Sequence, residues 1–364
     1  MNDSYYMKRA IELAYKGEGR TNPNPMVGCV IVRDGEIISE DYHHEYGHFH
    51  AERNALLKCT DAEGATAYVT LEPCCHYGKT PPCTEILIEK KIAKVVIGSR
   101  DPNPLVAGRG AKILREAGIE VVEDFLREEC DAINPVFFHY ISTGMPYVVM
   151  KYAMTLDGKI ATYSGKSKWI TGEAAREHVH KLRNKYAAIM TGIGTVLADD
   201  PMLNCRIPGG KDPLRVICDS SLKLPPACNI AETARDIPTI VFCADGADEA
   251  KKAALESLGV KVIAADDGSG RVDLYKTMQI LGEMKIDSVL IEGGGQIHES
   301  ALKAGIVNHV CAYIAPKIIG GKDARTPVEG RGVEAPDQAA LFTNLKCTQL
   351  GEDILLEADN KIKN

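Results

Sequence analysis

The chain has 364 residues, of which 45% are hydrophobic and 26% charged, with a formal net charge of −7 at pH 7. This length predicts two domains, since single domains usually hold about 100–200 residues, and no apolar run approaches the roughly 20 residues that span a bilayer. The acidic balance disfavours nucleic acid as a partner, because binding its phosphates over a broad surface requires a basic face.

Residues 4–16 place apolar side chains at helical spacing and predict an N-terminal helix. Charged residues are mixed with the apolar ones throughout this segment, so it lacks the charged-then-apolar order of a secretory signal. The 12 cysteines are scattered over the whole chain, which favours reduced thiols over a disulfide framework. We therefore expect a cytoplasmic protein.

Strands and helices alternate through the first part of the chain. Two strands are predicted within 26–40, joined at Asp34-Gly35, a dipeptide typical of tight hairpin turns. Further strands are predicted at 65–71, 93–99 and 119–123, with helices from about Ala51, around 83–91 and around 111–118. This alternation indicates a sheet with helices on its faces.

A turn signal at residues 143–146 marks the expected domain boundary. We place the boundary near Gly144, which gives domains of residues 1–144 and 145–364. The second domain starts a new α/β series, with strands predicted at 147–154, 187–193, 214–220, 239–244, 261–265, 287–295 and 309–321. The sequence contains neither a short-period repeat nor a low-complexity tract.

The first domain contains candidate metal ligands in two short segments, with His50 in one and Cys74 and Cys83 in the other. Thiolates and neutral imidazoles bind zinc, and a catalytic zinc keeps three protein ligands and a fourth position for water. Glu52 follows His50 by two residues, where its carboxylate can shuttle protons for that water. The order H-x-E, then P-C and a further cysteine, matches the signature of nucleobase zinc deaminases, except that nine positions instead of three separate the two cysteines.

Two alternatives stand beside this interpretation. The cysteine and the histidine that directly follow Cys74 are ligands of equal chemical suitability. A structural zinc closed by His50, Cys74, Cys75 and Cys83, in a non-enzymatic binding protein, is the second alternative. A structural zinc binds no reacting water, so it does not explain the presence of a proton-shuttling Glu52 beside the ligands.

Longer segments in both halves of the chain resemble one enzyme family. In the first half these are NPNPMVGCVIV, HAE, VTLEPCCHYGKTPPC and DPNPLVAGRG, which resemble the deaminase half of the bifunctional riboflavin-biosynthesis deaminase/reductases. In the second half KYAMTLDGKIAT, SKWITG, TGIGTVLADDPMLNCR, IEGGG and IAPKIIGG resemble the reductase half, in the same order. The resemblance covers almost the whole chain, and the wide cysteine spacing is a trait of that family.

The resemblance implies an α/β protein with an N-terminal cytidine-deaminase-like α/β/α sandwich and a C-terminal dihydrofolate-reductase-like α/β domain. In the first domain it implies His50, Cys74 and Cys83 as zinc ligands, with Glu52 as the proton shuttle. It assigns binding of a diaminopyrimidinone that carries a ribosylamino 5′-phosphate to Asn24, His43, Lys79 and Asn103. An ammonium such as that of Lys79 suits a phosphate on chemical grounds, although a solvated loop lysine is the simpler interpretation of that residue alone.

Gly293, Gly294 and Gly295 follow a predicted strand and precede a helix that is predicted to begin near Gln296. Glycines let the backbone approach a pyrophosphate, and a helix N-terminus adds amide donors. A plain strand-to-helix turn is the alternative. The Rossmann fingerprint G-x-G-x-x-G does not open this half, so the cofactor interpretation depends on the resemblance.

By the same resemblance, the dinucleotide site, expected for NADPH, is lined by Ala153, Trp169, Thr195, Asp199, Ser220 and the three glycines. The ribosylamino substrate is expected at Ser167, Arg183, Leu203, Arg206 and Glu292. The two arginines suit a phosphate, because a guanidinium presents fixed paired donors. Lys151 is the candidate catalytic residue near the hydride acceptor, with a structural ion pair as the alternative.

The resulting hypothesis is a bifunctional enzyme of riboflavin biosynthesis. The first domain hydrolyses the 2-amino group of the pyrimidine with Zn²⁺ and releases ammonia, and the second reduces the ribosyl to a ribityl side chain with NADPH. The alternative is a nucleoside or tRNA deaminase with a non-catalytic C-terminal binding domain. We expect phosphorylated pyrimidine substrates and further copies of the chain, as a dimer or tetramer, to be the partners, and neither nucleic acid nor a membrane.

Overall fold

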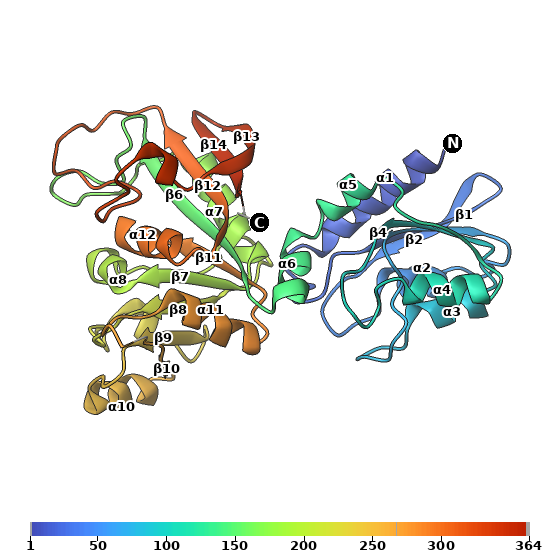
Figure 1. Cartoon of the computed structure of the whole chain (residues 1–364), viewed down its shortest axis with the longest axis horizontal. Helices are drawn as coiled ribbons and strands as arrows, with labels where there is room; N and C mark the ends of the chain where they lie inside the picture. Colours follow the sequence, from blue (N-terminus) through green and yellow to red (C-terminus); the bar gives the residue numbers. More distant parts are fainter. Residues whose placement is uncertain (1, 267, 362–364) are drawn as a thin grey trace. The chain divides into compact units, whose positions relative to one another are not determined.

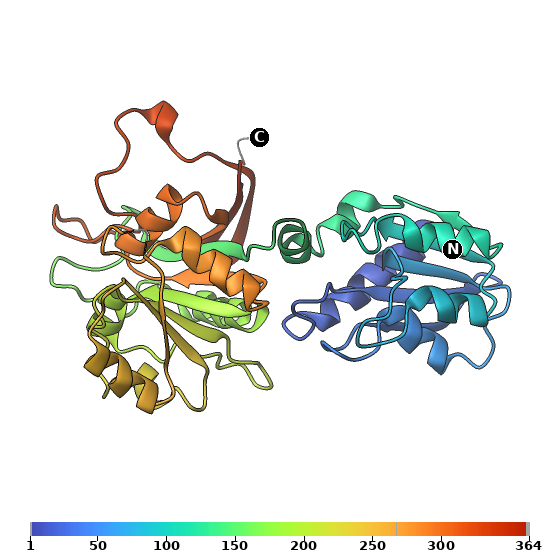
Figure 2. The ribbon, with the colours of Figure 1, turned by 60° about the horizontal axis from the view of Figure 1, so that its bottom comes forward.

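The computed structural model describes residues 2–266 and 268–361. The chain divides into two units, Met1–Gly144 and Met145–Asn364. Figure 1 shows the first unit from blue to green and the second from green to red, and Figure 2 shows the same ribbon turned by 60°. Helix α6 (Pro135–Thr143) comes last in the first unit and ends at Gly144, whose φ of 71° is left-handed.

The first unit is built on a five-stranded mixed sheet. Its strands are β1 (Gly28–Arg33), β2 (Glu36–Tyr42), β3 (Thr66–Leu71), β4 (Lys94–Ser99) and β5 (Glu120–Val122), in the order β2-β1-β3-β4-β5. β1 is antiparallel to β2 and β3, whereas β3, β4 and β5 are parallel. The predicted hairpin is confirmed, because Asp34 and Gly35 join β1 to β2 with positive φ angles of 54° and 81°, as the favoured two-residue turn requires.

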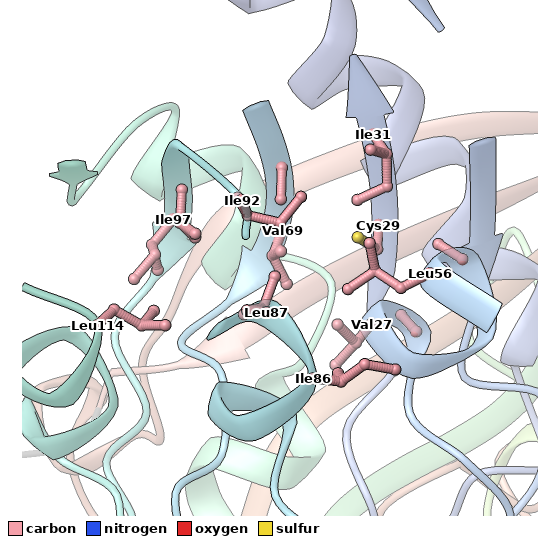
Figure 3. Close-up of a cluster of buried hydrophobic side chains, with 14 of the residues drawn as sticks. Val27, Cys29, Ile31, Leu56, Val69, Ile86, Leu87, Ile92, Ile97 and Leu114 are labelled. Carbon is pink, nitrogen blue, oxygen red and sulfur yellow. The ribbon is translucent and has the colours of Figure 1, made fainter. Parts of the chain in front are cut away.

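Helices cover both faces of this sheet. They are α1 (Asp3–Ala14) with the 3-10 turn η1 (Tyr15–Gly17), α2 (Ala51–Lys58), α3 (Cys83–Glu89), α4 (Arg109–Glu116) and α5 (Arg127–Asp131). Figure 3 shows the core on one face, where Leu56 of α2, Leu87 of α3 and Leu114 of α4 pack against the strands. On the other face, Met7 of α1 and Cys130 of α5 lie in a second apolar cluster. The predicted α/β/α sandwich is therefore confirmed.

The second unit is built on a nine-stranded sheet. Its strands are β6 (Tyr147–Thr155), β7 (Ala188–Gly192), β8 (Leu214–Cys218), β9 (Thr239–Cys243), β10 (Lys261–Ala264), β11 (Ser288–Glu292), β12 (Val307–Ala315), β13 (Phe342–Leu350) and β14 (Asp353–Asn360). They lie in the order β10-β9-β8-β7-β11-β6-β12-β14-β13. The strands from β10 to β12 pair in parallel, and β14 and β13 add an antiparallel hairpin at one edge.

Helices also cover both faces of the second sheet. They are α7 (Glu173–Lys185), α8 (Ile193–Asp199), α9 (Asn229–Glu232), α10 (Glu249–Ser257), α11 (Leu274–Glu283) and α12 (Gly295–Lys303), with a short 3-10 turn η2 (Pro336–Gln338). One core packs α11 and α12 against the sheet through Met278 and Ile297. A second core on the opposite face contains Val196 of α8, Ile230 of α9 and Leu255 of α10. The predicted α/β class is confirmed for this unit as well.

Several elements differ from the sequence-based predictions. The strand expected over 309–321 begins at Val307 and ends at Ala315, directly before Pro316, which has no backbone N–H to donate. Strands β13 and β14 and helix α6 were not predicted. The side chains of β13 are mostly exposed, so this strand has no apolar run to reveal it. In the described part of the chain, no helix has the length and hydropathy that crossing a bilayer requires.

Candidate active sites

Three metal-ligating side chains of the first unit converge at the start of two helices. His50 is the residue before α2, Cys83 is the first residue of α3, and Cys74 lies in the loop between β3 and α3. Nδ1 of His50 is 3.4 Å from Sγ of Cys74 and 3.6 Å from Sγ of Cys83. The backbone N–H of Cys83 also donates to Sγ of Cys74 at 3.3 Å. Short local segments therefore bring the three predicted ligands together.

The spacing of these donors fits zinc. Zinc–nitrogen and zinc–sulfur bonds of about 2.0 and 2.3 Å at a tetrahedral angle place the two ligand atoms roughly 3.5 Å apart, close to the separations between His50 and the two sulfurs. Cys75, the alternative ligand, instead directs its Sγ at the carbonyl of Leu105, 3.5 Å away. Among the described residues, the cluster of possible ligand atoms within 4.8 Å holds His50, Cys74 and Cys83 without a fourth member. A three-ligand set leaves a position open for water, as a catalytic zinc requires.

Glu52 lies in the first turn of α2 beside this cluster and is only 3% exposed. Burial, with the nearby charge of Cys74 as a smaller cause, raises the pKa of Glu52 to about 7. The hydrogen bond with Cys83 lowers the pKa of the Cys74 thiol against the effect of burial, and His50 acts in the same direction. A carboxyl group that titrates near neutral pH can accept a proton and return it, and a thiolate is the form that binds metal.

Asn24 and His43 lie together next to the metal cluster. Nδ2 of Asn24 is 3.2 Å from Nε2 of His43, and the His43 and His50 rings are 5.1 Å apart. Burial lowers the pKa of His43 to about 4, so the ring is neutral at physiological pH. Nδ1 contacts the carbonyl of Phe49 at 3.0 Å and must carry the proton, which leaves Nε2 as the acceptor from Asn24.

The other two predicted substrate residues of the first unit have different surroundings. The ammonium of Lys79 lies 3.9 Å from the centre of the Tyr46 ring, and its side chain is otherwise exposed. Oδ1 of Asn103 accepts from the backbone N–H of Leu105 at 3.0 Å, so part of its hydrogen-bonding capacity holds its own loop. The structure gives neither residue a direct contact with His50, Cys74 or Cys83.

Two buried carboxylates near this site were missed by the sequence analysis. Glu72 directly follows β3 and accepts from the backbone N–H groups of Gly108 and Ala111 at 3.0 and 3.2 Å. Asp101 follows β4 by two residues, and burial raises its pKa to about 6. The signal that reveals them is an acidic residue at the carboxyl end of a buried strand, where parallel strands bring their following loops together.

In the second unit, a cavity of about 1510 Å³ gathers the predicted reductase residues. Its wall contains every one of them: Lys151, Ala153, Ser167, Trp169, Arg183, Thr195, Asp199, Leu203, Arg206, Ser220, Glu292, Gly293, Gly294 and Gly295. They come from the ends of several strands and from the loops that follow. A volume of this size is ample for a dinucleotide beside a second ligand.

A buried ion-pair network lies in the wall of this cavity. The Arg183 guanidinium donates to both carboxylate oxygens of Glu292, at 2.9 and 3.0 Å, and to the carbonyl of Asn204 at 3.0 Å. Nζ of Lys151 is 3.4 Å from Glu292. Burial alone raises the pKa of Glu292, but Arg183 and Lys151 outweigh it and lower that pKa to about 2. Lys151 therefore faces the cavity in a fixed position beside a permanent negative charge.

The loop that carries Trp169 is tied down by a distant lysine. Nζ of Lys317 donates to the carbonyl oxygens of Trp169 and Ile170 at 3.1 and 2.7 Å. The Arg176 guanidinium lies 4.8 Å from the centre of the Trp169 ring, which remains 61% exposed. The chain's single tryptophan is therefore a wall of the cavity and is not part of the core.

The three glycines have different steric reasons to be glycine. A Cβ at Gly295 would lie 2.4 Å from Cγ of Glu329 and 2.7 Å from the carbonyl of Thr326, and one at Gly293 would lie 2.8 Å from Ile297. At Gly294 the nearest atom is Oγ1 of Thr195, 3.6 Å away. Close packing within the chain thus explains the outer two, and Gly294 alone has room in front of it at the start of α12.

Two family models match the chain, one in each unit. The cytidine and deoxycytidylate deaminase zinc-binding region matches residues 1–99, and the RibD C-terminal domain matches residues 146–356. The riboflavin biosynthesis protein RibD of Actinobacillus pleuropneumoniae is 59% identical over 359 residues, which are 98% of this chain and 95% of that protein. The protein of the same name from Escherichia coli (strain K12) is 39% identical over 370 residues, covering 98% and 99%.

Solved structures agree over the same length. Acinetobacter baumannii RibD, form 2, superposes with a TM-score of 0.87 at 40% identity and covers 99% of both chains. A diaminohydroxyphosphoribosylaminopyrimidine deaminase/5-amino-6-(5-phosphoribosylamino)uracil reductase from Thermotoga maritima superposes with a TM-score of 0.84 at 40% identity and covers 98% of both.

Proposed function

Because the chain belongs to the RibD family of bifunctional riboflavin-biosynthesis deaminase/reductases, we propose that each unit performs one of its two reactions with the residues described above. The chain is a zinc-dependent deaminase and an NADPH-dependent reductase. The observation that supports the residue assignment is that the predicted residues of each unit lie together within that unit. The first has three zinc donors beside Glu52, and the second has fourteen predicted residues around one cavity.

In the deaminase, His50, Cys74 and Cys83 hold the zinc ion. When bound, the ion supplies a Lewis acid that makes water a nucleophile near neutral pH. Glu52 takes a proton from the attacking water and passes it to the leaving amine. The oxygen of the water becomes the C2 carbonyl, and the 2-amino group leaves as ammonia. The neutral His43 orients Asn24 through its hydrogen bond in the wall of the pyrimidine pocket, Asn24 hydrogen-bonds the pyrimidine, and Lys79 and Asn103 bind the ribosylamino phosphate.

In the reductase, NADPH supplies a hydride when it is bound. The residues that would hold the dinucleotide are Ala153, Trp169, Thr195, Asp199, Ser220 and the three glycines. The backbone N–H groups at the start of α12 would suit its phosphates. Lys151 hydrogen-bonds the sugar at the ring oxygen that separates from C1′ as the ribosyl group opens to ribityl. Glu292 and Arg183 fix the position of Lys151. Arg206, Ser167 and Leu203 hold the remainder of the substrate.

The test follows ammonia release and NADPH oxidation separately with the diaminopyrimidinone ribosylamino 5′-phosphate as substrate. We expect Cys83→Ser to lose the zinc of this site and ammonia release, whereas the matched control Cys75→Ser keeps both. Arg206→Ala should release ammonia normally and fail to oxidise NADPH. Full deamination by Cys83→Ser, or loss of zinc in Cys75→Ser, would overturn the ligand set.

We further propose that the enzyme is a cytoplasmic homo-oligomer that binds neither nucleic acid nor membranes. The twelve cysteines are free thiols, which suits a reducing compartment. Leu341 and Leu345, at the start of the edge strand β13, are 56% and 72% exposed, as at a surface between subunits. Light scattering on the purified chain decides the oligomeric state, and cell fractionation decides the compartment.

A further inference from the structure

A second group of metal-ligating side chains lies at the edge of the second sheet. Strands β12 and β14 pair antiparallel there, with His309 opposite Asp359 and Cys311 opposite Glu357. Residues two apart on a strand point to the same face. The register therefore places an imidazole, a thiol and two carboxylates side by side on one face of the two strands.

The distances within this group are short. Nδ1 of His309 is 2.7 Å from Oδ1 of Asp359, and its Nε2 is 3.8 Å from Oε1 of Glu357. The ligand atoms of His309, Cys311 and Glu357 all lie within 4.8 Å of one another. Cys311 is 1% exposed, and the side chains of His309 and Glu357 are 18% and 24% exposed. These three side chains thus form a largely buried cluster, unlike an exposed acidic patch, and Asp359, at 44% exposed, lies on its solvent side.

The orientation of the imidazole is the one that a metal ligand needs. Nδ1 of His309 faces the Asp359 carboxylate and donates its proton to it, so Nε2 is the nitrogen that faces Glu357 and Cys311. Burial lowers the pKa of His309, but hydrogen bonds with Cys311, Glu357 and Asp359 outweigh it and raise that pKa to about 10. A metal ion therefore displaces a proton from Nε2 when it binds. A histidine that donates one N–H to a carboxylate and offers the other nitrogen to the metal is the usual arrangement in zinc proteins. Thiolate, imidazole and carboxylate together are a donor set for zinc and related transition metals, and not for magnesium or calcium.

We propose that His309, Cys311 and Glu357 bind a divalent transition-metal ion, with Asp359 orienting the histidine. None of these four residues lines the reductase cavity, and all belong to the unit that lacks the deaminase zinc. The site is therefore additional to both proposed reaction centres. An ion there ties β12 to β14 and so fastens the C-terminal hairpin to the parallel part of the sheet.

Lys346 competes with a metal ion for the Glu357 carboxylate. Nζ of Lys346 on β13 lies 3.9 Å from Oε2 of Glu357, and its side chain is 73% exposed. An exposed ion pair of this length contributes at most about 1 kcal/mol, so it does not prevent Glu357 from binding an ion through Oε1. On the other side, Lys151 is the register partner of Cys311 on β6, and its ammonium pairs with Glu292.

The experiment is a cobalt titration of the full-length protein after its metals are removed with a chelator. Cobalt(II) substitutes for zinc and reports thiolate ligands by its absorption. We expect two equivalents to bind to the parent protein. Cys74→Ser, which breaks the deaminase site, should bind one equivalent and keep a cobalt–thiolate band from Cys311. Glu357→Gln and Cys311→Ser should each bind one equivalent, at the deaminase site, with ammonia release unchanged.

The matched control is Cys347→Ser on β13, an exposed cysteine outside the cluster, which should bind two equivalents. Retained NADPH oxidation in Glu357→Gln and Cys311→Ser, with the deaminated substrate supplied, verifies that the second unit of these variants has folded. One equivalent in the parent protein, together with none in Cys74→Ser, overturns the proposal while leaving the deaminase zinc intact. Two equivalents in both Glu357→Gln and Cys311→Ser overturn it equally.

Discussion

Two buried glutamates, one in each unit, show how the same side chain acquires opposite properties. Glu52 lies beside the Cys74 thiolate, and burial together with that charge raises its pKa to about 7. The side chain of Glu292 is also largely shielded, at 10% exposed, but Arg183 and Lys151 lower its pKa to about 2. Burial opposes the charge in both, so the neighbours decide the outcome. The first carboxyl group is suited to exchange protons, and the second is suited to remain charged and hold cations in place.

The largest expected effect removes the proton-exchanging carboxyl. Glu52→Gln keeps the size of the side chain and does not touch the three zinc donors. We expect ammonia release to fall by about 10²–10⁴-fold, the usual contribution of a general acid–base group, with zinc content unchanged. NADPH oxidation with the deaminated substrate supplied should stay normal. If deamination survives at near the parent rate, the proposed role of Glu52 is wrong.

The second prediction removes Arg183, the principal partner of Glu292. Arg183→Met leaves a buried carboxylate with Lys151 alone, and breaking a buried pair in this way costs about 3–5 kcal/mol. Urea unfolding followed through Trp169, which reports on the second unit, measures this change. The matched control is Arg176→Met, whose guanidinium lies over the Trp169 ring, and it should cost less than about 1 kcal/mol. Adding Glu292→Gln to Arg183→Met should restore part of the lost stability, because the unpaired charge is removed.

The low pKa of Glu292 also predicts how the stability of the second unit depends on pH. The pKa of Glu292 is lower in the folded than in the unfolded protein, so its stabilising contribution is complete above pH about 4.5 and is lost as the pH falls toward 2. The lowered pKa corresponds to roughly 3 kcal/mol. We therefore expect the free energy of unfolding of the second unit to fall more steeply over this range in the parent than in Glu292→Gln. Parallel curves for the two proteins would contradict the assignment.

The smallest effects concern the helix that begins at the glycines. Gly295→Ala places a methyl group against Glu329 and Thr326 and should cost about 1–3 kcal/mol. Gly294→Ala meets no atom closer than 3.6 Å and should cost less than about 1 kcal/mol. The same change should raise the KM for NADPH if phosphates approach the backbone there. Equal losses of stability in the two variants would show that packing restricts Gly294 too.

Two helix starts repeat the contrast between the units. His50 before α2 and Gly294 before α12 have almost the same backbone angles, φ −75° and ψ 168° against φ −74° and ψ 167°. Neither uses a side-chain cap. The first presents an imidazole to the site and the second presents bare backbone. The same backbone conformation before a helix therefore positions a metal ligand, His50, in the first unit. In the second unit it leaves space for a ligand in front of Gly294.

Much of the fold could be predicted, because most strands are buried apolar runs and their turns carry glycine or asparagine and aspartate signals. The order H-x-E followed by P-C and a further cysteine indicated a zinc site, and the family resemblance singled out Cys74 and Cys83 as its thiolate ligands. What could not be predicted depends on long-range pairing. Strand β13 has mostly exposed side chains, and it exists because β14 supplies its hydrogen bonds.

Buried charge was the least predictable feature. Arg215 is fully buried, and its guanidinium donates to five acceptors, among them the carbonyl of Ile237 and the hydroxyl of Thr239. Its sequence neighbours are apolar, so pattern alone indicates an ordinary strand. Its acceptors come from α9, from β9 and from the loops beside them, and these distant residues satisfy the guanidinium. The same holds for Glu72, whose backbone partners are more than 30 positions away.

Strand β6 gives the second unit a particular order of assembly during synthesis. It is the first strand of that unit to leave the ribosome, yet its neighbours are β11 and β12, and Tyr147 pairs with Ser288. The pairings of the first unit lie within its own 144 residues, so that unit can complete its sheet early in translation. More than 130 further residues must be synthesised before β6, the strand that carries Lys151, can pair with β11. Until then the apolar side chains of β6 are exposed and prone to aggregation.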